Sequence, residues 1–273
     1  MIDSLVSSSW LKAHINDANL IILDASQKSN KAQLTTTTET AQIPNSIAFD
    51  LKVFSDSKSD FPNTIPSSEQ FEKEACNLGI TNSSTIIVYD NLGIYTSPRV
   101  WWLFKAMGHK NVAVLDGGLP DWIAMGFDTT QNKQTELAHN SKGYSAKLDS
   151  NLVRNFEAIT SNLTTKKEII IDARSHNRFH ALVPEPRKGL RGGHIPNSIN
   201  IPFEAVLQNG YLKSKEELKQ LFSSFNLAEK PLAFTCGSGI TACIVYLASE
   251  QVLENSKAVY DGSWTEWAQL SKV

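Results

Sequence analysis

The sequence predicts an α/β fold made of two tandem domains, each a parallel sheet with helices on both of its faces. Two observations carry this prediction. Short apolar strands alternate with amphipathic helical stretches along the chain, which is the pattern of a parallel sheet. Motifs of the first half also return in the same order in the second half, 145 to 152 residues later. The chain is therefore expected to hold two copies of one domain.

Four pairs of segments establish the repeat. The apolar stretch IILDAS returns as IIIDARS, AQIPNSIAFDL returns as GHIPNSINIPF, and VLDGGLPDW returns as VYDGSWTEW. A helix-start signal of the capping-box type, with a serine followed three residues later by Gln or Glu, also occurs twice. The matched pairs are residues 21–26 with 169–175, 41–51 with 193–203, 67–70 with 214–217 and 114–122 with 259–267. We expect a first domain over residues 1–130, a polar linker over 131–144 and a second domain over 145–273.

Composition excludes several classes of function. A net charge of -2 over 273 residues gives no sign of a nucleic acid or an anionic membrane as a partner. No apolar run approaches the ~20 residues that span a bilayer. The first residues lack a basic flank before an apolar stretch, and they carry acids but no arginine, so no secretory signal or transit peptide is expected. The three cysteines cannot all pair and show no C-x-x-C spacing. We therefore expect a cytoplasmic protein without a metal or cofactor.

One cysteine has a reactive setting. Residues 232–235 are typical of a buried strand, and Cys236 follows at its carboxyl end, where parallel sheets bind their ligands. Gly237 and Gly239 let the next loop turn its amides inward before a helix begins. These amides and the positive end of the helix dipole favour a thiolate, which is the nucleophilic form of cysteine.

The other cysteines and the first domain lack this setting. Cys243 falls on the helix and Cys76 lies within another amphipathic stretch, so both are expected to be inert filling. The matching strand of the first copy ends at Asp90 instead of a cysteine, and the first domain is therefore expected to be catalytically inactive. Ser97 and Pro98, which follow, are typical of an N-cap and a first helical position.

Several motifs in order resemble the tandem rhodanese-type sulfurtransferases over nearly the whole chain. They are SPRVWWLFKAMGH and VLDGGLPDW in the first half, then RFHALVPEPRKGLRGGHIPNSINIPF, and finally CGSGIT. The last loop is most similar to that of 3-mercaptopyruvate sulfurtransferases. Thiosulfate-preferring rhodaneses typically carry a basic residue directly after the cysteine, where this chain has Gly237 and Ser238.

The resemblance implies a sulfur transfer through a persulfide on Cys236. The thiolate attacks the sulfur of a small-molecule donor, 3-mercaptopyruvate, and pyruvate leaves. A thiol, thioredoxin or cyanide then accepts the outer sulfur. Thiosulfate:cyanide transfer remains an alternative activity of the same site.

The resemblance also implies a set of substrate-binding residues. Arg178 and Arg187 match the substrate-binding arginines of the family, and guanidinium groups suit carboxylates. The alternative is that both are ordinary surface arginines on a loop, with no role in donor binding. Arg174 is instead expected to pair with Asp172, and His194 to be structural. The loop residues expected at the substrate are Gly237, Ser238, Gly239, Ile240 and Thr241.

The chain departs from the family at one proposed proton relay. In mercaptopyruvate enzymes, a serine at the place of Ser238 is thought to act with a histidine and an aspartate of the first domain. An ungapped alignment puts Asn63 and Lys52 at those two places. No Ser-His-Asp relay is therefore expected, and the choice between the two donors stays open.

The sequence also bears on two other classes of function. A cysteine-dependent phosphatase needs an arginine after five intervening residues, and here that position is Ala242. A non-enzymatic binding module agrees with Asp90 in the first copy but not with the complete Cys236 loop in the second. Both are disfavoured.

Overall fold

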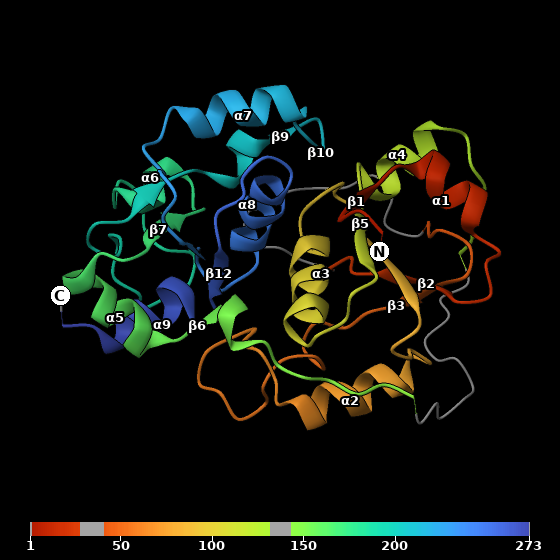
Figure 1. Ribbon diagram of the computed structural model, residues 1–273, viewed down its shortest axis with the longest axis horizontal. Coiled ribbons are helices and arrows are strands. Elements are labelled where there is room, and N and C mark those ends of the chain that lie inside the picture. Colours follow the sequence, from red (N-terminus) through yellow and green to blue (C-terminus); the bar gives the residue numbers. More distant parts are fainter. Residues whose placement is uncertain (1, 28–40, 132–142, 273) are drawn as a thin grey trace. The chain divides into compact units, whose positions relative to one another are not determined.

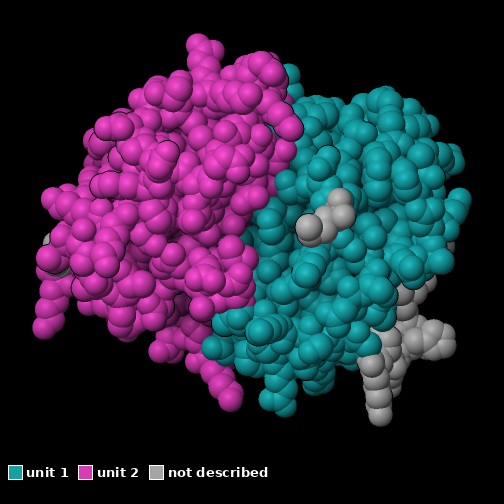
Figure 2. Space-filling view, viewed as in Figure 1, with its two compact units in different colours: residues 1–57, 65–148, 209–212 teal, residues 58–64, 149–208, 213–273 magenta. Residues whose placement is uncertain are grey.

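The computed structural model describes residues 2–27, 41–131 and 143–272, and the chain forms two compact units (Figures 1 and 2). Unit 1 contains residues 1–57, 65–148 and 209–212, and unit 2 contains residues 58–64, 149–208 and 213–273. Each unit thus includes a short segment from the other half of the chain. Most of the expected linker, residues 132–142, lies outside the described residues, and the expected domain boundaries remain a prediction.

Unit 1 holds a five-stranded sheet in the order β1-β5-β4-β2-β3, and all of its neighbouring strands are parallel. The strands are β1 (Leu5–Val6), β2 (Leu20–Asp24), β3 (Ser46–Ala48), β4 (Thr85–Tyr89) and β5 (Val112–Leu115). The helices are α1 (Ser8–His14), α2 (Ser68–Asn77), α3 (Ser97–Ala106) and α4 (Gly118–Ala124).

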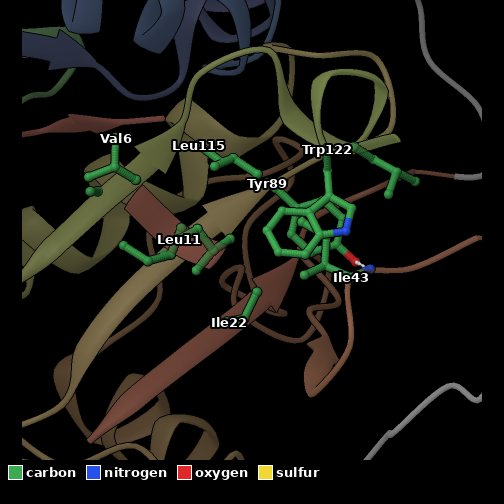
Figure 3. Packing of buried hydrophobic residues seen from close by; sticks show 10 residues of the cluster. Val6, Leu11, Ile22, Ile43, Tyr89, Leu115 and Trp122 are labelled. Atoms are coloured by element: carbon green, nitrogen blue, oxygen red, sulfur yellow. Dashed lines mark hydrogen bonds between the residues drawn. The ribbon is translucent and has the colours of Figure 1, made fainter. Parts of the chain in front are cut away.

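Helices cover both faces of this sheet. On one face, Leu11 of α1 and Trp122 of α4 belong to the same buried cluster as Ile22 and Tyr89 of the strands (Figure 3). On the other face, α3 packs against β4 and β5. Because successive side chains of a strand point to opposite faces, covering both faces explains why residues 86–89 are all fully buried.

Unit 2 repeats this sheet with the strand order β6-β12-β11-β7-β8, again parallel throughout. The strands are β6 (Val153–Arg154), β7 (Ile169–Asp172), β8 (Ile199–Asn200), β11 (Leu232–Thr235) and β12 (Lys257–Tyr260). The helices are α5 (Phe156–Thr165), α6 (His176–Phe179), α7 (Lys215–Ser223), α8 (Thr241–Glu250) and α9 (Ser263–Leu270). Short 3-10 helices span Ser150–Leu152 and Phe203–Val206, and the two-residue strand β9 covers Leu207–Gln208. The two-residue strand β10 (Tyr211–Leu212) lies in the 209–212 segment of unit 1.

The core of unit 2 follows the same plan. Ile159 of α5 and Trp264 and Trp267 of α9 join Ala233 and Tyr260 in a cluster on one face of the sheet. Helix α8 packs against β11 and β12. The prediction of two α/β copies with parallel sheets is confirmed. Within the described residues, no helix combines the length and apolar character needed to cross a bilayer.

The predicted helix starts are largely confirmed. Ser67 accepts a hydrogen bond from the amide of Gln70, and Ser214 forms a complete capping box with Glu217. The expectation for Ser97 was wrong, since Thr96 is the N-cap of α3 and Ser97 is its first residue. The physical reason is that the amide and hydroxyl of Ser97 both donate to Asp90.

Candidate functional site

The candidate nucleophile follows the central strand of the unit 2 sheet. Cys236 comes directly after β11 and is only 2% exposed. The chain leaves β7 toward β8 on one side and leaves β11 toward β12 on the other, so the two strands flank a topological switch point. Ligands of open α/β sheets bind at such points, beyond the carboxyl ends of the strands. Gly239, in the loop that leads to α8, has a φ of 79°, which favours glycine.

The start of α9 holds the cysteine loop in place. The carbonyl of Cys236 accepts from the amide of Trp264 at 2.9 Å, and the amide of Cys236 donates to the Ser263 hydroxyl at 3.3 Å. The carbonyl of Gly237 accepts from both the amide, at 3.0 Å, and the hydroxyl, at 2.5 Å, of Thr265. These hydrogen bonds satisfy the carbonyls of residues 236 and 237. They fix the backbone of the loop against the start of α9.

Two further contacts hold the middle of the loop. The side-chain Nδ2 of Asn63 donates to the backbone carbonyl of Ser238 and lies at hydrogen-bond distance from its hydroxyl, both at 3.2 Å. Asn63 lies in the 58–64 segment of unit 2. On the other side, the Cys243 thiol donates to the carbonyl of Gly239 at 3.3 Å. Cys243 thus supports the loop, whereas Cys76 lies on α2 of the other unit, and none of the three cysteines forms a disulfide.

Arg178 approaches the loop from α6 and is paired with a buried acid. Its Nη2 lies 2.6 Å from Glu185 Oε2, and its Nε lies 3.3 Å from Oε1 of the same residue. A Cβ at Gly237 would lie 2.8 Å from the same Nη2. The absence of a side chain at Gly237 therefore lets the guanidinium lie directly against the cysteine loop.

The expected pairing of Arg174 with Asp172 is confirmed. Arg174 Nη2 lies 2.6 Å from Asp172 Oδ2, and Nη1 reaches Glu185 at 2.9 Å. His194 stacks on Phe179 with ring centroids 4.0 Å apart, in agreement with the structural role expected for it.

Arg187 has a different environment from Arg178. Its Nη1 donates to the Thr265 hydroxyl at 3.3 Å. Burial lowers the pKa of Arg187 and the charge of Arg178 adds to this shift, whereas the charges of Cys236 and Glu185 oppose it. The half-buried Arg187 cation therefore lies within electrostatic range of both the cysteine and Arg178.

Unit 1 holds a carboxylate in the place of the cysteine. Asp90 follows β4, the central strand, and is 1% exposed. Its Oδ2 accepts from three successive amides, those of Tyr95, Thr96 and Ser97, and from the Ser97 hydroxyl, at 2.7 to 2.9 Å. Oδ1 accepts from the amide of Leu92 at 3.0 Å. Burial raises the pKa of Asp90, and these hydrogen bonds counteract the rise. The loop at this position of the fold thus surrounds a carboxyl group with amides.

The structure brings most of the predicted site residues together. Gly237, Ser238, Gly239 and Ile240 form the loop, and Thr241 is the first residue of α8. Arg178 lies against that loop. The Thr265 hydroxyl accepts a hydrogen bond from Arg187 and donates one to the Gly237 carbonyl of the loop. Lys52 is exposed and belongs to unit 1.

Sequence reasoning missed Glu185, Ser263 and Thr265. The first lies within the motif PEPRKG and the other two within VYDGSWTEW. Both motifs were noted, but nothing in their pattern shows that an acid would pair with Arg178 or that two hydroxyls would bond to the cysteine loop.

Comparison with known proteins agrees with this architecture. A family model described as a rhodanese-like domain matches residues 7–125 and 156–270. The mouse 3-mercaptopyruvate sulfurtransferase is 38% identical over 275 residues, which cover 97% of this chain and 91% of the relative. The Arabidopsis thaliana thiosulfate/3-mercaptopyruvate sulfurtransferase 1, mitochondrial, is 36% identical over an alignment of 288 residues, gaps included. That alignment covers 97% of this chain and 76% of the relative.

A solved structure is similar over nearly its whole length. The crystal structure of SseA from Escherichia coli, described with the 3-mercaptopyruvate sulfotransferases and their rhodanese fold, superposes with a TM-score of 0.84 at 30% identity. The match covers 96% of this chain and 99% of that one. With two copies of the same parallel sheet and a family match over most of each, this chain belongs to the family of rhodanese-like proteins.

Proposed function

We propose that this protein is a sulfurtransferase that transfers sulfur from 3-mercaptopyruvate to a thiol or to cyanide through a persulfide on Cys236. The observation that carries the proposal is the setting of Cys236, at the end of a central strand, in a buried loop before a helix, with two arginines beside it. The relatives named for the two sulfur donors support the same reaction.

In the first half-reaction, the Cys236 thiolate attacks the thiol sulfur of mercaptopyruvate. A sulfur–sulfur bond forms while the carbon–sulfur bond of the donor breaks, and its electron pair passes to the leaving enolate of pyruvate. The proton of the donor thiol ends on the methyl group of pyruvate, so the protein is left with a persulfide anion.

In the second half-reaction, an acceptor attacks the outer sulfur of that persulfide. Cyanide forms thiocyanate, and a thiolate, either of a small molecule or of thioredoxin, forms a new persulfide. The sulfur–sulfur bond breaks and its electron pair returns to Cys236, which regenerates the starting thiolate.

The loop amides are the groups that would hold the persulfide anion. Support comes from unit 1, where Asp90 occupies the corresponding place and accepts from the amides of residues 95–97 at the start of α3. The matching amides at the start of α8 are those of Gly239, Ile240 and Thr241. Unit 1 has no thiol at this place, and we propose that it serves as a catalytically inactive scaffold.

The donor would bind between the loop and the arginines. Arg187 and Arg178 supply cationic groups for the donor carboxylate, and Ser238 supplies a hydroxyl close to the cysteine. A second candidate, thiosulfate:cyanide transfer, is favoured by the same pair of cations, because thiosulfate is also an anion. Steady-state rates with the two donors, measured side by side, decide between these activities.

The test of the proposed function is the mass of the protein after incubation with a donor alone. We expect the gain of one sulfur atom on Cys236, no gain in Cys236→Ser, and an unchanged gain in Cys76→Ser, the matched control on α2. A wild-type protein that gains no sulfur from either donor would contradict the proposed function.

We also propose that the protein works in the cytoplasm. Its three cysteines form no disulfide, which suits a reducing compartment. One relative is named as mitochondrial, so fractionation of cells that express the full chain is the appropriate test.

A further inference from the structure

Four charged side chains form an alternating row beside the candidate site. Asp172 pairs with Arg174 at 2.6 Å, Arg174 pairs with Glu185 at 2.9 Å, and Glu185 pairs with Arg178 at 2.6 Å. The first three side chains are at most 2% exposed, and that of Arg178 is 22% exposed. Two acids and two bases cancel, so that the row as a whole carries no net charge.

Glu185 is the member of the row that gives the two candidate donor-binding arginines different environments. It contacts Arg178 through both Nε and Nη2, which are the two donors on one edge of the guanidinium. Arg187 instead donates to the neutral hydroxyl of Thr265, and in the described part of the chain it forms no ion pair with a carboxylate. Glu185 therefore compensates Arg178 through direct hydrogen bonds, whereas it acts on Arg187 only through space, with no hydrogen bond between them in the described part of the chain.

This division has a consequence for any anion that binds near the loop. Arg178 can still donate hydrogen bonds through its remaining N–H groups. Its charge, however, is balanced by a buried carboxylate within hydrogen-bond distance. The attraction for an anion then comes chiefly from Arg187. Coulomb energies scale with the product of the charges, so a ligand with two negative charges gains more from each added cation than a ligand with one.

We propose that Glu185 is a specificity-determining residue that matches the site to a donor with a single negative charge, such as a mercapto-monocarboxylate, over a doubly charged donor such as thiosulfate. This inference rests on the proposed sulfurtransferase function. Glu185 acts here through Arg178 and is a positioning residue, not a catalytic one.

The matched pair of variants is Glu185→Gln and Glu168→Gln. Both remove one charge from an Arg–Glu pair of unit 2, since Glu168 lies 2.6 Å from Arg154. Glu168, however, precedes β7 at the amino end of the sheet, whereas the candidate site lies at the carboxyl ends. The Gln side chain keeps an oxygen that accepts a hydrogen bond from an arginine.

The measurement is kcat/KM with mercaptopyruvate and with thiosulfate, at low and at high salt. In Glu185→Gln, we expect the ratio of thiosulfate to mercaptopyruvate to rise roughly tenfold at low salt, and this rise to shrink at high salt. Glu168→Gln is expected to change the ratio less than about twofold. An equal fall for both donors in Glu185→Gln, or an unchanged ratio, would overturn the proposal.

A second measurement uses the wild-type protein and does not depend on how the variant folds. Malonate and its monomethyl ester differ mainly in carrying two charges or one, and each is tested for protection of Cys236 against iodoacetamide. The proposal expects the monoanion to protect at a concentration equal to or below that of the dianion. Protection by malonate at the lower concentration would overturn it. Failure of the proposed function itself appears separately, as a wild-type Cys236 that gains no sulfur from either donor.

Discussion

The Asn63 side chain lies 3.2 Å from two oxygens of Ser238, the backbone carbonyl and the hydroxyl. A carbonyl oxygen only accepts hydrogen bonds, so the group that faces it must be the amide nitrogen of Asn63. The same nitrogen then donates to the Ser238 hydroxyl, whose own hydrogen is left to point elsewhere. Asn63 has a φ of 62°, a left-handed conformation that asparagine adopts more readily than most residues. The residue at the histidine place of the family thus acts as a fixed donor to the loop.

Replacing Asn63 by aspartate should reverse this interaction. An ionised carboxylate would place an acceptor against the Ser238 carbonyl, and we expect kcat/KM for the donor to fall by roughly tenfold or more. A protonated carboxyl donates as the amide does, so the ratio of variant to wild-type activity should rise as the pH falls from about 6 to about 4, near the ordinary aspartate pKa of about 3.9.

The ratio is the useful quantity because pH effects that are common to both proteins cancel in it. Asn63→Ala removes the donor without adding a titrating group, and its ratio to wild type should not change with pH. A pH-independent ratio for Asn63→Asp would mean that the contact with Ser238 does not matter for turnover.

The sequence was sufficient for the fold and for the candidate cysteine loop with its two arginines, but not for the side chains that hold them in place, Glu185, Ser263 and Thr265. The repeat of IILDAS and IIIDARS placed β2 and β7, and CGSGIT placed the candidate nucleophile. The ion pair of Arg178 with Glu185 and the contact of Asn63 with Ser238 depend on loops that come together only in the folded unit. Short segments of loop carry no periodicity that reveals their partners. The error at Ser97 has the same origin, since the Asp90 carboxylate determines how α3 begins.

Gly237→Ala should weaken donor binding while the protein stays folded. The new Cβ would meet Arg178 Nη2 at 2.8 Å, and Glu185 holds that guanidinium on its other side. The arginine must therefore move or lose its pairing, and we expect a loss of about tenfold in kcat/KM for the donor. Gly126→Ala is the control, because nothing lies within 4 Å of its Cβ and any cost of its φ of 72° falls on stability. Full activity of Gly237→Ala would show that the position of Arg178 is unimportant.

Asp90 should make the stability of the protein depend on pH. Burial raises the folded-state pKa of Asp90 above its ordinary 3.8, so the folded protein binds the proton more tightly than the unfolded chain. The resulting stabilisation is fully present below pH 3.8 and is lost as the pH rises through the folded-state pKa. It amounts to about 1.4 kcal/mol for each unit by which the pKa is raised.

The measurement is the free energy of unfolding in denaturant at several pH values, for wild type and for Asp90→Asn. The variant cannot ionise at this position. The free energy of unfolding of the wild type should therefore fall relative to that of the variant as the pH rises. Asp128→Asn, at a side chain that is 90% exposed, is the control and should follow the wild type. Parallel curves for wild type and Asp90→Asn would show that Asp90 titrates alike in both states.

Neutralising the two arginines should have unequal effects. Arg187→Gln removes a half-buried cation that forms no ion pair within the described residues, and we expect kcat/KM for mercaptopyruvate to fall tenfold to a hundredfold, roughly the loss of one charge-assisted hydrogen bond. Arg178→Gln removes a guanidinium whose Nε and Nη2 already donate to Glu185, so that fewer hydrogen bonds to the donor are lost. Its effect on kcat/KM should therefore be smaller.

Arg187→Lys retains the charge and should recover part of the loss. Transfer from the preformed persulfide to cyanide involves no donor carboxylate. In Arg187→Gln, its rate should therefore change less than the rate of persulfide formation. Equal losses in the two glutamine variants would mean that the ion pair of Arg178 with Glu185 does not divide the roles of the arginines.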